Sequence, residues 1–413
     1  MEKLARQLEL SSNFHLLSIG VERAAYYGIR TIIILHMVSE TINMSREEAL
    51  SIYGIFTSII ILSRIFGAII GDFLFGNRAV LIWGGLLQML GAFVFCIDSL
   101  IAVYIGLGLV SIGSGFYYPN LFAQFGKLYK KRIKLLDAGF IAFYLAISVG
   151  SFVGVLGIGY VSDLDFKFGF ILSGLLFLLA TIILIQKKAP VQDLTSLNDK
   201  YSKNIIQICI TIIFFTSGLY WLAYEQGSTV IFQSIYEATE NITNTFFKEI
   251  VKNFNSLATI VFCFVALVYW RNNHLKRIIK IIGGLVSAAI GFLMIMILAK
   301  NGSSANIPFL LIALSFIGIS EVLIAPTIHS ILVVYVKSKY IATIYSLLVI
   351  PTRLFTALFI FIEVFEYDEI QRILVFSIIL LLLLGIALYL LRDYFIETEN
   401  MSMEIDEIGR KNE

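Results

Sequence analysis

The sequence predicts an all-α polytopic membrane protein with about twelve transmembrane helices in two six-helix halves. Its 413 residues are 58% hydrophobic and only 15% charged, and the mean hydropathy is +0.87. A soluble domain carries about a quarter charged residues. The apolar runs show no alternation with a period of two, which favours membrane-spanning helices over a β-barrel.

Twelve apolar runs have about the 20 residues that a helix needs to cross a bilayer, or more. We expect helices over residues 14–38, 49–71, 79–97, 100–123, 137–160, 167–186, 205–232, 250–270, 277–299, 307–336, 340–364 and 371–391. The longest charged internal stretch separates the sixth run from the seventh. This division predicts a first bundle over 1–186, a linker over 187–204, a second bundle over 205–392 and a tail over 393–413.

Lysine and arginine collect in one set of the expected loops, with the densest group between residues 127 and 134. By the positive-inside rule, both termini are then cytoplasmic, which requires an even number of spans. We expect a monomeric, multi-pass protein of a bacterial inner membrane, with the lipid bilayer as its surroundings.

Several other classes of protein are disfavoured. The net charge of +2 argues against a nucleic-acid surface, which needs a clustered basic face. The chain has no His-Glu-x-x-His pattern, and its four histidines are scattered, so we do not expect an intramembrane enzyme or a metal cofactor.

Ionisable residues within the expected first helix indicate a polar site, because charges inside a membrane are costly. Arg23, Tyr27 and Arg30 follow i, i+4, i+7 spacing and share one helix face. Two guanidinium groups on one face can receive a carboxylate or phosphate in bidentate fashion. The alternative is that these arginines form structural ion pairs with carboxylates inside the protein.

Four arginines and three glutamates lie within the expected spans: Arg23, Arg30, Arg64 and Arg353, with Glu22, Glu225 and Glu321. If all of these side chains line one cavity, the excess positive charge favours an anionic or zwitterionic solute. Glu225 follows an aromatic stripe on the seventh expected helix, and Pro326 follows Glu321 on the tenth, where a proline can kink a helix.

The run Val21–Arg30 reads Val-Glu-Arg-Ala-Ala-Tyr-Tyr-Gly-Ile-Arg and resembles the helix-1 signature Glu-x-x-Glu-Arg-Phe-x-Tyr-Tyr-Gly. That signature is typical of the proton-dependent oligopeptide transporters of the major facilitator superfamily. Further resemblances follow in the expected order at Gly67–Arg78, Pro119 with Asn120, Phe143–Ser151, Glu225–Ser228, Asn255, and Glu321 with Pro326.

The resemblance implies the major facilitator fold and the import of di- or tripeptides, or a related amino-carboxylate solute, by alternating access with protons. It implies no cofactor beyond the proton gradient. The implied site residues are Arg23 and Arg30 for the carboxylate, Asn255 and Glu321 for the amine, and Tyr26 or Tyr27 in the pocket wall. Glu225 would be a gating or proton-linked carboxylate.

Three positions depart from the family's pattern: Ile19, Tyr118 and Ser148 stand where the family has a glutamate, a lysine and an asparagine. Arg353 or Arg64 can compensate for the lysine, and similar expected depth makes Glu22 and Arg64 a candidate gating pair. These departures keep open a carrier of another organic anion, an uncoupled facilitator or, less favoured, a non-transporting membrane sensor.

Overall fold

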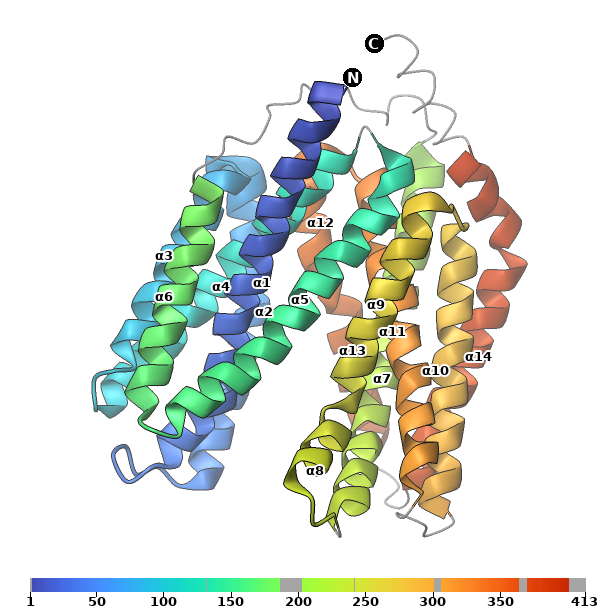
Figure 1. The fold of residues 1–413 in the computed structure, drawn as a ribbon. Coiled ribbons are helices and arrows are strands. Elements are labelled where there is room, and N and C mark those ends of the chain that lie inside the picture. The colour runs from blue at the N-terminus through green and yellow to red at the C-terminus, as the bar shows by residue number, and fades with distance from the viewer. Residues whose placement is uncertain are drawn as a thin grey trace. The chain divides into compact units, whose positions relative to one another are not determined.

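The computed structural model describes residues 2–130, 132–185, 203–240, 242–300, 306–363 and 370–400, and within these ranges the regular structure is helical. Eleven helices are long and apolar enough to cross a membrane by length and composition. Helix α1 (Glu2–Val38), which carries Glu22, Arg23 and Arg30, is a further long helix (Figure 1). The predicted all-α, multi-spanning fold is therefore confirmed.

From α2 to α6 the helix bounds follow the predicted runs, whereas α1 begins at Glu2 and not at the expected residue 14. They are α2 (Arg46–Ile70), a π-helical turn η1 (Gly71–Phe75), α3 (Asn77–Val94), α4 (Leu100–Tyr129), α5 (Ile133–Ser162) and α6 (Phe166–Ile185). In the second part they are α7 (Lys203–Glu240), α8 (Thr245–Lys252), α9 (Phe254–Asn272), α10 (Arg277–Lys300), α11 (Ile307–Tyr335), η3 (Ser338–Tyr340), α12 (Ile341–Leu347), α13 (Val349–Glu363) and α14 (Ile370–Leu390).

Three features of the second part differ from the expected helices. Helix α7 continues to Glu240, beyond the expected end at residue 232. The short helix α8 precedes α9, where a single run was expected. The expected helix over 340–364 is divided at Leu348 into α12 and α13. Pro351 has no N–H to donate to the carbonyl of Leu347, which explains why α12 ends at that residue.

Contacts between residues divide the chain into two compact units that do not coincide with the two halves of the sequence. Unit 1 contains Met1–Lys131, Phe143–Ser196 and Val336–Leu347, and unit 2 contains Arg132–Ala142, Leu197–Tyr335 and Leu348–Glu413. The first turns of α5 therefore belong to unit 2, and α12 belongs to unit 1. Most of the predicted linker over 187–204 lies outside the described residues, as does the predicted tail beyond residue 400.

Small residues hold α1 against α5 within unit 1. A Cβ atom at Gly150 would lie 2.1 Å from the carbonyl oxygen of Gly20, and one at Gly154 would lie 2.1 Å from that of Ala24. Such close backbone contact is typical of helix pairs in membranes that use small residues at the interface. This contact fixes the position of α5 next to the charged segment of α1.

The turn between α2 and α3 is held by polar contacts within unit 1. Gly76 has φ = 81°, which a residue with a side chain rarely adopts. The Asp72 carboxylate accepts hydrogen bonds from the Asn77 side chain and, at 2.8 Å, from both the backbone N–H and hydroxyl of Thr343 at the start of α12. Arg78 donates to the carbonyls of Leu184 and Ile185 at the end of α6.

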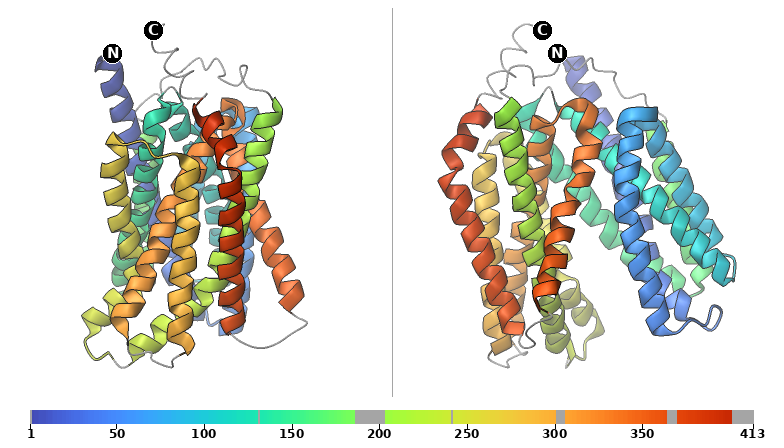
Figure 2. Two further views of the ribbon diagram at one scale, coloured as in Figure 1. Left: turned by 90° about the vertical axis from the view of Figure 1, so that its right-hand side faces the viewer. Right: turned by 180° about the vertical axis from the view of Figure 1, so that it is seen from behind.

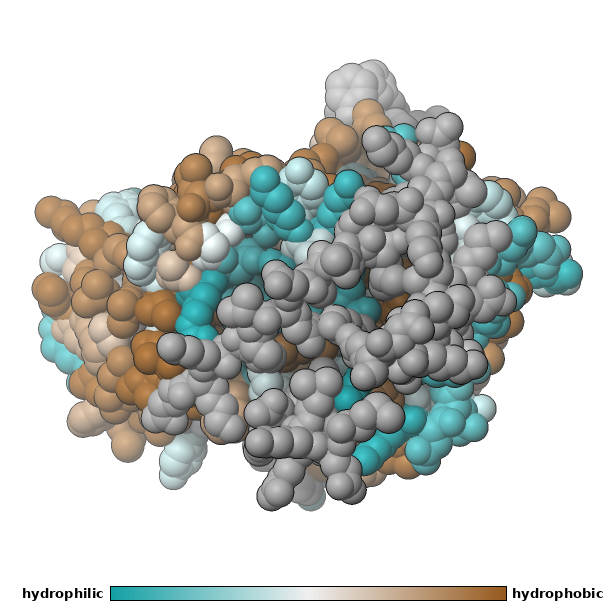
Figure 3. All heavy atoms as spheres, turned by 90° about the horizontal axis from the view of Figure 1, so that it is seen from above, coloured by the Kyte–Doolittle hydropathy of each residue, from teal (hydrophilic) through white to brown (hydrophobic). Residues whose placement is uncertain are grey.

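In unit 2, α10 packs against α11 and α14, and Figure 2 shows α10 and α14 side by side. Gly284 and Gly291 of α10 make room for Ile324 and Ile317 of α11, since an added Cβ would lie within 2.6 Å of those side chains. Large hydrophobic side chains remain exposed on both units, and Figure 3 shows hydrophobic residues gathered along the left edge of the view. Such a surface is suited to lipid.

Candidate functional site

Arg23, in the middle of α1, is buried and its charge is balanced within its own helix. Its Nε and Nη2 atoms donate to the two carboxylate oxygens of Glu22 at 2.5 and 2.7 Å, and both side chains are at most 3% exposed. The guanidinium carbon lies 4.5 Å from the ring centre of Tyr26 and 4.7 Å from that of Tyr118 in α4. Arg23 and Glu22 thus form a neutral pair between aromatic rings.

Arg30, two turns further along α1, is surrounded by tyrosines instead of carboxylates. Its Nε donates to the hydroxyl of Tyr53 in α2 at 2.7 Å. Its guanidinium carbon lies 5.6 to 5.8 Å from the ring centres of Tyr26, Tyr27 and Tyr53. Aromatic faces attract a cation but do not neutralise it, so Arg30 keeps a positive charge available to a ligand.

Arg64 of α2 approaches the same group of rings. Its guanidinium carbon lies 5.2 Å from the ring centre of Tyr118, the ring that Arg23 also contacts. Among the ion pairs of the described residues, Glu22 pairs with Arg23 and not with Arg64, so the suggested Glu22–Arg64 pair is not what the structure contains. Arg23, Arg30, Arg64 and the four tyrosines 26, 27, 53 and 118 are called the arginine–tyrosine cluster below.

A second polar group lies in unit 2 around Glu321, which is 9% exposed in α11. Tyr224 of α7 donates its hydroxyl to the Glu321 carboxylate, and the Asn255 side chain of α9 donates to the same hydroxyl at 3.4 Å. One turn from Tyr224 on α7, the hydroxyl of Tyr220 shares a hydrogen bond of 3.0 Å with that of Ser320, the residue before Glu321. The Tyr224–Glu321–Asn255 group therefore presents one carboxylate and two amide or hydroxyl groups in an apolar surrounding.

Glu225, next in sequence to Tyr224, faces a different helix of unit 2. Its carboxylate lies 3.0 Å from an Nη atom of Arg353 in α13, and it also accepts a hydrogen bond of 3.3 Å from the Thr356 hydroxyl. The side chains are 33% and 50% exposed for Glu225 and Arg353. Arg353, suggested above as a substitute for the missing lysine, is therefore the ion-pair partner of Glu225.

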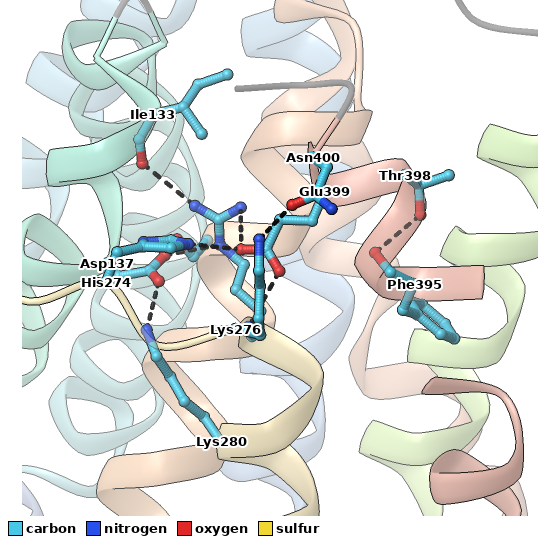
Figure 4. A network of polar contacts seen from close by, with 11 residues as sticks. Ile133, Asp137, His274, Lys276, Lys280, Phe395, Thr398, Glu399 and Asn400 are labelled. Atoms are coloured by element: carbon cyan, nitrogen blue, oxygen red, sulfur yellow. Dashed lines mark hydrogen bonds and ion pairs between the residues drawn. The ribbon is translucent and has the colours of Figure 1, made fainter. Parts of the chain in front are cut away.

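A third polar group, not predicted from the sequence, surrounds Asp137 at the start of α5 (Figure 4). Its carboxylate accepts hydrogen bonds from Arg277 at 2.7 Å, from Lys280, and from the hydroxyl of Ser330. All of these residues belong to unit 2. The side chains of Asp137, Arg277 and Lys280 are at most 5% exposed, so this Asp137 network is a buried set of charges.

Residues 392–400, after α14, are helical, and their end contacts the Asp137 network. Glu399 accepts from His274 at 3.0 Å and lies 3.4 Å from Arg277 (Figure 4). Burial acts to raise the pKa of Glu399, but the hydrogen bond from His274 and the charge of Arg277 outweigh it and hold the pKa below its usual value. The end of the described chain is thereby attached to α10.

The structure brings the predicted substrate-binding residues together in two groups, one in each unit, and the predicted coupling residues Glu225 and Arg353 form a separate ion pair in unit 2. Arg23, Arg30, Tyr26 and Tyr27 form one group, and Glu321 with Asn255 forms the other. Tyr53 was missed because an aromatic residue in an apolar run gives no charge signal. The Asp137 network was missed because Asp137 falls at the boundary of an expected span, where a charge is unremarkable.

Comparisons with known proteins agree with the motif resemblance. The sequence profile of the Major Facilitator Superfamily matches residues 16–360. The uncharacterised transporter YclF of Bacillus subtilis is 33% identical over 177 residues, 40% of this chain and 36% of the relative. Dipeptide and tripeptide permease B of Aliivibrio fischeri is 26% identical over 196 residues, 46% of this chain and 39% of the permease.

The matched region is thus less than half the length of these curated relatives. Among solved structures, the peptide transporter POT in complex with sulfate superposes with a TM-score of 0.63 at 19% identity. That match covers 93% of this chain and 94% of the other, which shows a shared fold.

Proposed function

Because the chain belongs to the Major Facilitator Superfamily and is an integral multi-pass membrane protein, we propose that it is a secondary transporter that imports di- or tripeptides, or a related amino-carboxylate solute, with protons. The relatives named as peptide permeases support this substrate class. A POT transporter of known structure, 18% identical with a TM-score of 0.63, is described in complex with 5-aminolevulinic acid, which also carries an amine and a carboxylate. The proposal includes a monomer in a bacterial inner membrane with both termini cytoplasmic, driven by the proton gradient with no cofactor.

The observation that carries the proposal is the charge that each polar group offers within its own unit. In the arginine–tyrosine cluster, Arg30 is positive and has no carboxylate partner among the described residues, which suits a solute carboxylate. In the other group, the Glu321 carboxylate with Asn255 suits a protonated amine. Each group, taken by itself, is complementary to one of the two charged groups of an amino-carboxylate solute.

Proton coupling is assigned to Glu225 in this proposal. Coupling needs a group whose protonation changes during the cycle, and Ile19, which is fully buried, offers none at the position where the family has a glutamate. Glu22 is bonded to Arg23, and Glu321 must stay ionised to bind an amine. Glu225 is partly exposed and therefore reachable by a proton, and its protonation would remove the charge that pairs with Arg353.

The test is uptake of a dipeptide library into proteoliposomes with and without an inward proton gradient. Accumulation that requires the gradient is expected for the unmodified protein. Arg30→Ala should weaken solute binding by roughly 1.5–3 kcal/mol, because it removes a charge-assisted hydrogen bond from a half-buried guanidinium group. Binding that is unchanged in Arg30→Ala would place the solute carboxylate elsewhere.

Glu225→Gln separates coupling from binding. This variant should lose gradient-driven accumulation and keep counterflow exchange, which needs no net movement of protons. Accumulation against a gradient by Glu225→Gln would show that another group carries the proton. If the unmodified protein transports dipeptides without any dependence on the proton gradient, the apolar Ile19 marks an uncoupled facilitator.

A further inference from the structure

The arginine–tyrosine cluster contains more positive charge than one solute carboxylate can balance. Both oxygens of Glu22 are bonded to Arg23, so that pair is neutral. Arg30 and Arg64 form no ion pair with any carboxylate among the described residues, and their neighbours are tyrosines. Two of the three guanidinium groups in the cluster therefore keep their full charge.

Close packing of α2 on α4 sets the position of Arg64. An added Cβ at Gly115 would lie 2.4 Å from the backbone of Ser63 and 2.7 Å from the backbone nitrogen of Arg64. Tyr118 follows Gly115 by one helical turn, and this places the Arg64 guanidinium against its ring. The position of Arg64 is thus determined by the backbone contact between the two helices.

Arg64 also has an unused hydrogen-bond donor. Its Nε atom is buried and has no acceptor within the part of the chain that the structure describes. A buried donor without an acceptor is costly, and native proteins rarely leave one unsatisfied. A ligand oxygen would satisfy this donor.

The three arginines of the cluster share two aromatic rings. The guanidinium carbons of Arg23 and Arg30 lie 4.5 and 5.8 Å from the ring centre of Tyr26, and those of Arg23 and Arg64 lie 4.7 and 5.2 Å from the ring centre of Tyr118. Coulomb interactions are strong in a medium of low dielectric constant. An anion that lies near both Arg30 and Arg64 is therefore stabilised by the two charges together. A solute with a single carboxylate would leave one of these charges uncompensated.

We propose that Arg64 is a specificity residue that receives a second anionic group, so that the protein prefers amino-carboxylate solutes with an additional acidic group, such as dipeptides with an aspartate or glutamate side chain. This inference rests on the proposed function, because it takes the arginine–tyrosine cluster as the anion site of the solute. The inference specifies that the preferred solute carries two negative charges and not one.

The experiment uses two dipeptides that differ in one functional group, Ala-Glu and Ala-Gln. Their dissociation constants are measured by calorimetry with the full chain in lipid nanodiscs. The unmodified protein should bind Ala-Glu about tenfold more tightly than Ala-Gln, equivalent to about 1.4 kcal/mol. In Arg64→Gln this ratio should fall towards one, and Arg64→Lys should keep a smaller preference because a point charge lacks the bidentate geometry.

Arg46→Gln is the matched control, because Arg46 is exposed at the start of the same helix and should leave the ratio unchanged. Equal binding of the two dipeptides by the unmodified protein, or an unchanged ratio in Arg64→Gln, would overturn the inference while leaving the proposed function intact. If Arg64→Gln does not fold, an unchanged ratio in Arg64→Lys overturns it equally. Failure of every dipeptide to bind would refute the proposed function and this inference with it.

Discussion

The Asp137 network allows a quantitative prediction, because its charges are buried and its contacts are short. Asp137 is the acceptor for Arg277 and Lys280, and the side chains of these three residues are at most 5% exposed. Asp137→Asn keeps the shape of the side chain and removes its charge, which leaves two buried cations with Glu399 as the nearest remaining carboxylate. Breaking a buried pair in this way costs about 3–5 kcal/mol.

The assay is the free energy of unfolding in detergent, followed by tryptophan fluorescence, since Lys280 lies 4.2 Å from the ring centre of Trp270. The control is Asp98→Asn, which breaks the ion pair with Lys167, where both side chains are 41% exposed. Solvent screens that pair, so its loss should cost far less. A second substitution, Lys280→Met, should recover part of the stability lost in Asp137→Asn, because it removes one unpaired buried cation. The reasoning is refuted if Asp137→Asn is no more destabilising than Asp98→Asn.

Three further outcomes are expected. Tyr224→Phe removes a hydrogen bond to Glu321 and should weaken the binding of amine-bearing solutes less than Glu321→Gln does. Competition binding measures the affinity of both variants, with an amine-free analogue as the control. A larger loss in Tyr224→Phe than in Glu321→Gln would contradict the assignment of Glu321 to the amine. Gly150→Leu should prevent correct folding, detected as aggregation in gel filtration, because its side chain would overlap the backbone of α1. His274 and Arg277 lower the folded-state pKa of Glu399. The stabilisation by residues 392–400 is therefore present above the ordinary pKa of 4.5 and is lost as the pH falls through the lowered value. Proteolysis of this segment should increase on acidification, and Glu399→Gln should show no such pH dependence.

The sequence was sufficient to predict the fold because membrane helices give a strong signal in hydropathy alone. The expected runs at 100–123 and 277–299 correspond to α4 and α10, and the errors fall at helix ends such as Tyr129, where polar residues extend a helix beyond the apolar run. Arg23, Arg30 and Glu321 were identified because a charge in an apolar run is conspicuous. Which partner each charge takes could not be read from the sequence, since it depends on helix rotation and tilt.

Arg23 and Arg30 show most clearly that the sequence predicts where a charge lies but not which partner it takes. Spacing placed Arg23 and Arg30 on one helix face as two equivalent anion ligands, but Glu22, adjacent in sequence, binds Arg23 in full. Tyr118, which breaks the family's pattern, proved to be the ring between Arg23 and Arg64. Contacts of this kind join helices that are distant in sequence, and local patterns do not contain them.

The segments at 132–142 and 336–347 have a consequence for the order of events during synthesis. When the ribosome has completed α6, the carboxylate of Asp72 still lacks the donors of Thr343, and Lys130 lacks the carbonyl of Val336 that it binds at 2.6 Å in the finished protein. The opening turns of α5 likewise wait for Arg277 and Lys280. Neither half of the sequence therefore contains all of its own folding partners. A gene divided at the linker should yield two fragments that fold only when both are present, and not two bundles that fold independently.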